Sequence, residues 1–306
     1  MPRLSAVLSL ILLTALLVVA GCGSAKPAAD DSASPPPSGT ASPSPSSTAT
    51  PVVKKVDHVA ISSEDPAALY KLFTGSLGLP VAWSYAKYPG FSTGGVHAGN
   101  VNLESLHFGP PAKTSTPGAM YYGIVLEPYP LAESVPELKA RGALPGKAQV
   151  TMTEVDGKQV PAWTNVTLKA LCGPEYVVYL CEYTPQMKAA LEGKATTGPL
   201  GPLGIVSVEK VVVTSKDAAS LRGAWSAAMA PDAMSSDGLL AMGDGPAVQV
   251  DQGGEDAFTT LVFKVASLET AKAALSDLGL LGAATATQLT IDPAKVQGLQ
   301  MVFVQE

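Results

Sequence analysis

Apolar and polar residues follow the same pattern at two distant places in this 306-residue chain, residues 56–69 and 208–221. Each stretch begins with a β-rich run, continues with apolar residues at helical spacing, and matches the other in chemical type at nearly every position. Such a self-match is the signature of an internal repeat. The chemistry of the two copies differs at one place, where His58 of the first is replaced by Lys210 in the second.

The repetition extends to the order of predicted elements, which is one strand, one helix and three strands. In the first unit, a strand at 56–61 precedes a helix that begins at Pro66 behind an Asp cap and ends in the Leu-Gly-Leu-Pro run at 77–80. β-Rich runs between turn residues complete the first unit with strands at 81–85, 91–96 and 101–108. The second unit has predicted strands at 120–126, 148–155, 158–163, 166–171 and 176–183 and a helix at 131–141. The third has strands at 208–213, 238–242 and 247–250 and a helix through Trp225, and the fourth has strands at 258–265, 286–291 and 299–304 and a helix at 267–278. We therefore predict an α+β fold of four βαβββ units that form two domains.

Composition divides the chain into segments of different character. Residues 23–51 consist mainly of Ser, Pro, Ala, Thr and Gly, which bury too little apolar surface to offset chain entropy, so we expect a disordered tether there. The predicted organisation is a lipoprotein signal peptide at 1–22, the tether at 23–51, a first domain at 52–185, a linker at 186–203, and a second, degenerate domain at 204–306.

The N-terminus carries a targeting signal. Arg3 precedes an uncharged apolar run at 4–19, and the Val-Ala-Gly-Cys run at 19–22 resembles the lipobox of bacterial lipoproteins. That resemblance implies that acyl chains such as palmitate modify Cys22 and anchor the protein at the extracytoplasmic face of the cell membrane. The alternative is an uncleaved signal anchor with an incidental cysteine, although a span needs about 20 apolar residues, slightly more than this run offers.

Charge and cysteine usage narrow the possible partners. The formal net charge of -6 makes a nucleic-acid partner unexpected, because phosphate binding needs a clustered excess of Lys and Arg. Besides Cys22, the chain has Cys172 and Cys181. They flank a predicted strand, and about eight extended residues at roughly 3.3 Å each would hold them beyond disulfide reach. We expect two buried free thiols.

The Val-Asp-His-Val-Ala-Ile strand at 56–61, the helix ending Leu-Gly-Leu-Pro, three strands and the pairing of repeats together resemble the vicinal oxygen chelate superfamily. This superfamily includes glyoxalases, extradiol dioxygenases and resistance proteins. The run from Gly94 to Glu104 also looks like the third and fourth strands of a glyoxalase-like module. The resemblance implies that two modules pair and that their mixed sheets curl around a cleft, one in each domain.

The resemblance also implies metal-ligand positions on the first and last strand of each module. In the first module these positions are His58 and Glu104, which match the usual ligand types. In the second they are Tyr122 and Leu180, with Glu182 two residues on and on the same strand face. His58, Glu104 and Glu182 could supply a triad for a divalent metal ion in the first domain.

The alternative is that His58 is a cleft histidine hydrogen-bonded to Glu104, with no metal cofactor. In the second domain the corresponding positions fall near Lys210, Gln249 or Asp251, Thr260 and Met301, which predicts no metal site. We therefore expect either no cofactor or one divalent ion in the first domain.

Aromatic residues concentrate in the first domain, where alternate positions would line the cleft with flat rings. The leading hypothesis is that this cleft binds a small organic molecule, and the expected ligand-binding residues are His58, Trp83, Glu104, Tyr122 and Glu182. One alternative is a metal-dependent lyase or dioxygenase that uses His58 and Glu104. Another is a non-catalytic envelope interaction module with both clefts filled by side chains. A homodimer is compatible with each, because the superfamily commonly pairs clefts across a dimer.

Overall fold

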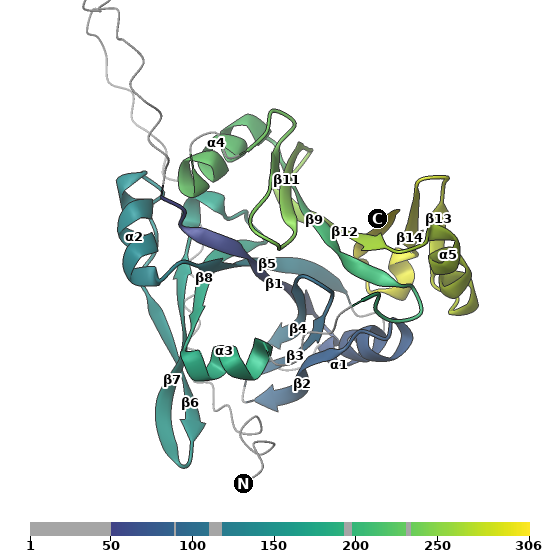
Figure 1. Ribbon diagram of the computed structural model, residues 1–306, viewed down its shortest axis with the longest axis horizontal. Coiled ribbons are helices and arrows are strands. Elements are labelled where there is room, and N and C mark those ends of the chain that lie inside the picture. The colour runs from purple at the N-terminus through teal and green to yellow at the C-terminus, as the bar shows by residue number, and fades with distance from the viewer. Residues whose placement is uncertain (1–49, 89, 110–117, 193–197, 231–233) are drawn as a thin grey trace, which may run out of the picture.

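The computed structural model describes residues 50–88, 90–109, 118–192, 198–230 and 234–306. These residues form two mixed sheets that pack on each other and carry helices on their outer sides (Figure 1). The signal segment with Cys22 and nearly all of the predicted tether lie outside the described residues. No helix of the part that is described has the length and apolar character needed to cross a membrane.

The first sheet has eight strands in the order β2-β3-β4-β1-β5-β8-β7-β6. Its strands are β1 (Val53–Ser63), β2 (Val81–Tyr88), β3 (Phe91–His97), β4 (Asn102–Phe108), β5 (Ala119–Pro128), β6 (Gln149–Val155), β7 (Lys158–Thr167) and β8 (Val177–Tyr183). Helix α1 (Pro66–Lys71), which continues as the π-helical turn η2 (Leu72–Ser76), belongs to the first module, and α2 (Leu131–Ala140) with the 3-10 turn η3 (Lys169–Leu171) belongs to the second.

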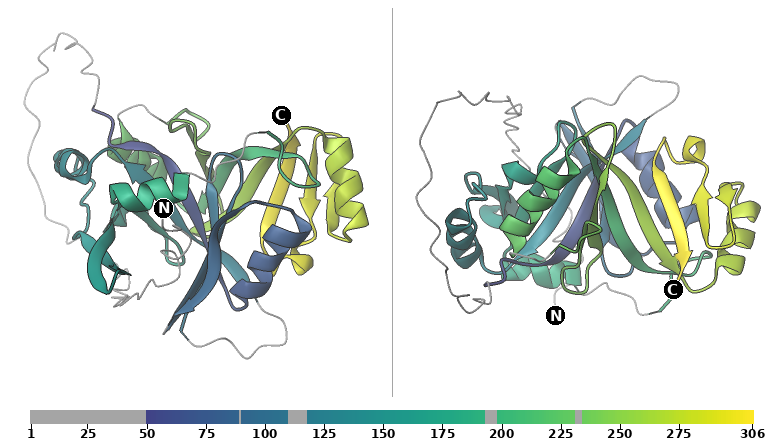
Figure 2. Two further views of the ribbon diagram at one scale, coloured as in Figure 1. Left: turned by 60° about the horizontal axis from the view of Figure 1, so that its bottom comes forward. Right: turned by 90° about the horizontal axis from the view of Figure 1, so that it is seen from above.

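The second sheet has seven strands in the order β10-β11-β9-β12-β15-β14-β13. Its strands are β9 (Ile205–Ser215), β10 (Leu239–Leu240), β11 (Ala247–Gln252), β12 (Ala257–Val265), β13 (Leu281–Ala284), β14 (Gln288–Ile291) and β15 (Gln300–Gln305), and its helices are α4 (Ala218–Met229), α5 (Leu268–Asp277) and the 3-10 turn η4 (Pro293–Lys295). Figure 2 shows α5 beside the C-terminal strands, at the end of the molecule opposite β6 and β7.

The two sheets repeat one pairing scheme. β1 pairs parallel with β4 and antiparallel with β5, just as β9 pairs parallel with β11 and antiparallel with β12. The repeat seen in the sequence also recurs in the helix caps, because Asp65 accepts a hydrogen bond from the Ala68 amide and Asp217 accepts one from the Ser220 amide, both at 3.0 Å. The predicted α+β class with paired modules and mixed sheets is confirmed.

The two sheets share one hydrophobic core rather than enclosing two. Val59 and Ile61 of β1 belong to the same buried cluster as Trp225 and Phe263 of the second half. The backbone of the first half also contacts that of the second half at Gly99, which has a φ of +87°. A Cβ added to Gly99 would lie 2.1 Å from the Val206 carbonyl oxygen, so a side chain does not fit there. Each sheet therefore buries one of its two faces, called the outer face, in this shared core. The other face of each sheet does not contribute to the core.

A further helix, α3 (Pro185–Glu192), occupies the first part of the segment predicted as a linker at 186–203. Met187, Ala190 and Leu191 are half-buried and lie at helical spacing, a short signal that the Gly- and Pro-rich residues after it obscured. Figure 1 shows α3 between the β6–β7 hairpin and strands β2 and β3, where the first sheet curls. As predicted, Cys172 and Cys181 form no disulfide bond in the described part of the chain; Cys181 is buried, whereas Cys172 is half-buried and not buried as expected.

Candidate functional site

The face of the first sheet that points away from the shared core is called the inner face here. Strand register places His58 opposite Asn102 of β4 and Val125 of β5, and Val125 opposite Tyr179 of β8. Because the neighbouring Val59 lies in the shared core, these four side chains lie on the other side of the sheet. Four residues that register places on the inner face, Ala60, Leu106, Val125 and Cys181, are buried without belonging to the shared core.

A β-bulge positions the titratable groups of this face. The register of β1 against β5 shifts between Val56 and His58, so that Asp57 is an extra residue in β1. Asp57 Oδ2 lies 2.6 Å from His58 Nδ1, and His58 Nε2 lies 3.6 Å from Glu104 Oε2. The side chain of His58 is therefore held between two carboxylates and is only 8% exposed.

The neighbouring charges outweigh the effect of burial on this pair. Burial alone lowers the pKa of His58, but the hydrogen bond and charge of Asp57 and the charge of Glu104 raise that pKa above its ordinary value. Burial alone raises the pKa of Asp57, but His58, a hydrogen bond from the Tyr183 hydroxyl at 3.0 Å and the charge of Lys55 lower it overall. Each group thus favours the charged form of the other.

Glu104 is oriented by a second chain of hydrogen bonds. Its Oε1 accepts a hydrogen bond from Thr93 Oγ1 at 2.6 Å, and Thr93 Oγ1 in turn accepts one from Trp83 Nε1 at 3.2 Å. The other carboxylate oxygen, Oε2, is left facing His58. An acceptor and a potential donor therefore stand next to each other on the inner face.

Aromatic rings surround this pair of groups. The rings of Trp83 and Tyr179 lie edge-on to the His58 imidazole, with centroids 6.3 and 6.4 Å from it. Burial, and then the charge of Glu104, raises the pKa of Tyr179 well above its usual value, so its hydroxyl stays protonated. This hydroxyl makes no hydrogen bond to any described residue, which leaves it able to bind a ligand.

The structure brings together three of the five predicted ligand-binding residues, namely His58, Trp83 and Glu104. Tyr122 packs edge-on to Phe108 at a centroid distance of 5.7 Å and makes no ring contact with His58 among the described residues, although its charge is one of those that raise the pKa of Tyr179. Glu182 lies elsewhere, because its Oε1 accepts a hydrogen bond from the Leu131 amide at the start of α2, at 2.9 Å.

The placement of Glu182 corrects the expected register of β8. Leu180 and Glu182 share a strand face, as expected, but Leu180 lies in the shared core, so this face is the outer one. The inner face of β8 carries Tyr179, Cys181 and Tyr183 instead. Because side chains alternate along a strand, a shift of one residue exchanges the two faces.

The expected ligand-binding residues did not include Asp57, Thr93, Tyr179 and Tyr183, although aromatic residues at alternate strand positions were expected to line the cleft. The position of Asp57 next to His58 was visible, but strict alternation assigns neighbours to opposite faces, and only the bulge brings their side chains together. The other three residues follow from strand register.

The described donor set does not fit a tightly held resident metal ion. A divalent ion bound by His and carboxylates takes at least three protein ligands, whereas His58 and Glu104 supply two. On the module-two strands, β5 and β8, the row of His58 continues with Val125 and Tyr179. No group of three or more His, Cys, Asp or Glu side chains able to hold a metal occurs in the described residues.

Comparisons with known proteins agree with the fold. No family model and no curated protein matches the chain. Among solved structures, a mutant of 4-hydroxymandelate synthase from Streptomyces coelicolor matches 84% of this chain and 93% of its own, with 12% identity and a TM-score of 0.54. Homoprotocatechuate 2,3-dioxygenase from Arthrobacter globiformis matches 86% of this chain and 83% of its own, with 13% identity and a TM-score of 0.54.

A Mn(II)-bound glyoxalase from Novosphingobium aromaticivorans matches 84% of this chain and 83% of its own, with 11% identity and a TM-score of 0.54. At these identities the similarity shows the fold alone. The chain has the two-domain fold of the vicinal oxygen chelate superfamily, and the resemblance read from its sequence is confirmed at that level.

Proposed function

We propose that the inner face of the first sheet binds a small organic molecule whose polar group lies against His58 and Glu104. The observation that carries this proposal is the 3.6 Å approach of His58 Nε2 to Glu104 Oε2 on a face lined by aromatic rings. Asp57 holds the other ring nitrogen of His58, so Nε2 points toward the ligand. A protonated imidazole donates and a carboxylate accepts, so the pair matches a ligand with an adjacent acceptor and donor.

The surroundings narrow the class of ligand. Trp83 and Tyr179 offer ring surfaces, and the free Tyr179 hydroxyl offers one more hydrogen-bond donor. We infer an aromatic or heterocyclic molecule with a phenol, enol or lactam group. Because His58 is only 6% exposed, side chains around it must move for this ligand to reach Nε2.

A binding screen tests this proposal. Thermal shift with a panel of phenols, catechols and lactam heterocycles should find compounds that stabilise the wild type but neither His58→Gln nor Glu104→Gln. Asp156→Asn, an exposed change in the β6–β7 turn, is the matched control and should respond as the wild type does. Hits that stabilise all four proteins equally, or no hits, would favour an interaction module whose cleft is filled by side chains.

A metal-dependent enzyme is the second candidate, and the fold comparisons support it more than they support simple capture. The similar structures include two homoprotocatechuate 2,3-dioxygenases and a Mn(II)-bound glyoxalase. The family resemblance assigns His58 and Glu104 to the metal-ligand positions of the first module. The Asp57 carboxylate lies 2.6 Å from the other ring nitrogen of His58, a contact that orients many metal-bound histidines. A divalent ion would supply Lewis-acid chemistry there, with the missing donors coming from the substrate.

Titration calorimetry with Mn(II) and Zn(II) separates the two candidates. If the site only binds an organic molecule, no binding of Mn(II) or Zn(II) should depend on His58. If the protein is a metal-dependent enzyme, it should bind one of these ions, and His58→Gln and Glu104→Gln should both remove that binding. Addition of catechol would strengthen ion binding only in the second case, because a chelating ligand supplies two further oxygens.

We also propose that acylated Cys22 tethers this site to the extracytoplasmic face of the cell membrane. The support is the lipobox-like run at 19–22 and the polar segment that follows it. Metabolic labelling with a palmitate analogue in a bacterial host should label the wild type and not Cys22→Ala. Equal labelling of both proteins would contradict the proposal.

A further inference from the structure

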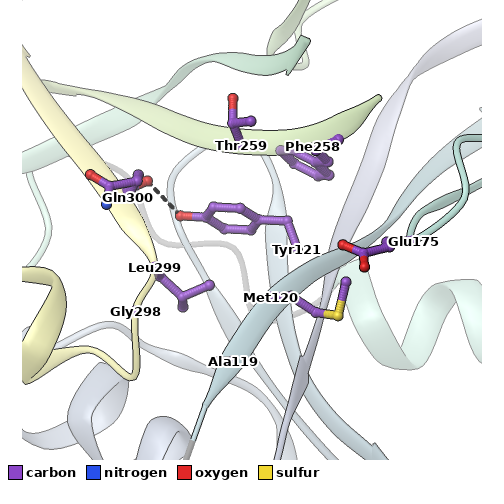
Figure 3. Close-up of a pocket in the computed structure, with 10 residues that line it drawn as sticks. Ala119, Met120, Tyr121, Glu175, Phe258, Thr259, Gly298, Leu299 and Gln300 are labelled. Atoms are coloured by element: carbon purple, nitrogen blue, oxygen red, sulfur yellow. Dashed lines mark hydrogen bonds between the residues drawn. The ribbon is translucent and has the colours of Figure 1, made fainter. Parts of the chain in front are cut away.

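A cavity of about 180 Å³ lies where the two sheets meet, away from the inner face that carries His58. β5 forms one wall, and β12 and β15 of the second sheet form the others (Figure 3). The lining residues are Ala119, Met120, Tyr121, Glu175, Ala257, Phe258, Thr259, Gly298, Leu299 and Gln300. This volume is below the about 300–1,000 Å³ of pockets for drug-sized ligands, so it suits a fragment-sized molecule.

Two stacked rings give the cavity a fixed apolar surface. Tyr121 and Phe258 lie with ring centroids 4.7 Å apart and planes at 22°, one ring from each sheet. Figure 3 shows the Tyr121 ring reaching toward β15, where its hydroxyl donates a hydrogen bond to the Gln300 carbonyl at 2.7 Å. Both rings are almost fully buried, so their orientation is set before any ligand arrives.

The charge at the cavity is negative. Glu175 is exposed and forms no hydrogen bond or ion pair with any described residue, and no Lys, Arg or His is among the lining residues. Figure 3 shows the Glu175 carboxylate and the Met120 side chain on the same side of Tyr121. A carboxylate attracts a cation, and a thioether adapts its shape to an apolar group.

A strained turn holds the third wall in place. Gln297, which directly precedes the lining residue Gly298, has a φ of +59°, a conformation that non-glycine residues rarely adopt. Its side chain accepts a hydrogen bond from Ser63 at 2.5 Å and donates one to the Asp65 carbonyl at 3.0 Å, while its carbonyl accepts one from the Ala119 amide at 2.8 Å. Three contacts with the first half thus fix the wall, and strain of this kind is commonly stored at binding sites.

We propose that this cavity is a second binding site, and that its ligand is a small organic cation with a flat apolar group, such as an arylmethylammonium. The apolar group lies against the Tyr121–Phe258 pair and the ammonium faces Glu175. The site is independent of the inner face, because it shares none of the residues that surround His58.

Titration calorimetry with benzylamine, benzyl alcohol and benzoate tests the proposal on the purified protein. The three probes share one ring and differ in charge. Benzylamine should bind about 1.4-fold to fivefold more tightly than benzyl alcohol, because an exposed ion pair contributes about 0.2–1 kcal/mol, and benzoate should bind most weakly. Glu175→Gln should remove the preference for benzylamine, while His58→Gln should leave it unchanged.

Two filling variants locate the binding. Ala119→Leu and Ala257→Leu each add a side chain to a lining residue and should weaken benzylamine binding at least tenfold. Near-ultraviolet circular dichroism identifies any variant that has lost its fold. If Ala119→Leu and Ala257→Leu are both unfolded, Glu175→Gln, a change at an exposed residue, still tests the proposal. Equal affinity for benzylamine and benzyl alcohol, no saturable binding at millimolar concentration, or loss of binding in His58→Gln would overturn the proposal.

Discussion

Asp57→Asn tests whether the Asp57 carboxylate keeps the buried His58 charged. The substitution preserves side-chain size and removes the charge that lies 2.6 Å from His58 Nδ1. In the wild type, burial lowers the pKa of His58, but Asp57 and Glu104 together raise it above the ordinary 6.5. With the Asp57 charge gone, burial is left as the strongest influence. We therefore expect the pKa of His58 to fall below its ordinary value in Asp57→Asn.

The cost to stability follows from the charged hydrogen bond. Such a bond contributes about 1.5–3 kcal/mol, and little solvent screens this one because His58 is 6% exposed. We expect Asp57→Asn to lower the free energy of unfolding by about 1.5–3 kcal/mol at pH 6. The loss should shrink to about 0.5–1.5 kcal/mol at high pH, where His58 is neutral in both proteins.

The sign of the pH dependence can be worked out for each group. The raised pKa of His58 gives stability that is fully present below its ordinary pKa of 6.5 and is lost as pH rises through the folded-state pKa. The lowered pKa of Asp57 gives stability that is present above its ordinary pKa of 3.8 and is lost as pH falls through the folded-state pKa. The pair therefore stabilises the fold most between these two ordinary values.

Two measurements check this prediction. NMR titration of the His58 Cε1–H resonance reports the pKa, and urea unfolding from pH 5 to 9 reports the stability. Asp156→Asn, the same substitution at an exposed turn, is the control and should change neither quantity. A His58 pKa that is unchanged in Asp57→Asn, or a stability loss that does not depend on pH, would refute the coupling.

Three further substitutions give distinct outcomes. Val125→His places an imidazole on the strand beside His58, where it would be a third metal ligand next to His58 and Glu104. This variant should bind Mn(II) or Zn(II) at least tenfold more tightly than the wild type in titration calorimetry. An unchanged affinity would show that His58 and Glu104 are not placed to bind a metal ion. Glu182→Ala removes the cap of α2 and should cost about 0.5–2 kcal/mol of stability in urea unfolding without changing ligand binding, whereas a loss of binding alone would place Glu182 in the site. Gly95→Ala puts a methyl group 2.4 Å from the Trp83 ring and should cost about 1–3 kcal/mol and shift the Trp83 fluorescence; an unperturbed spectrum would contradict the close packing.

The fold could be predicted because its signals are local and repeated. The caps at Asp65 and Asp217 and the β-rich runs before them specify the same unit twice, and both caps form as expected. Pairing of the units into curled sheets followed from the family resemblance. The single core shared by the two halves was not expected, since sequence pattern shows which residues are buried and not which partners bury them.

The site was predictable in part, through His58 of β1, Trp83 of β2 and Glu104 of β4. His58 and Glu104 were identified from the repeat and the resemblance, and the structure places their side chains together. Glu182 was misplaced because one residue of register exchanges the faces of β8. Asp57 was missed because a bulge breaks alternation, and a bulge depends on how two strands pair.

The cavity between the sheets lay beyond sequence reasoning for a related reason. Tyr121 and Phe258 are 137 positions apart in the numbering of the chain, and only the packing of β5 against β12 stacks their rings. The left-handed conformation of Gln297 likewise has no signal in the sequence, because Gln is not a residue that favours it. A site between the two halves of the chain is formed by tertiary contacts, which the sequence pattern does not show.

The most direct test of the proposed function is the metal content of the purified protein, prepared without chelator or affinity metal, beside that of His58→Gln. Both samples are dialysed against Mn(II), Zn(II) or Fe(II) and then against metal-free buffer, and the retained ion is counted by mass spectrometry. We predict that neither protein retains a stoichiometric ion, because His58 and Glu104 supply only two donors. One ion per chain in the wild type, lost in His58→Gln, would contradict direct capture and establish a resident metal centre.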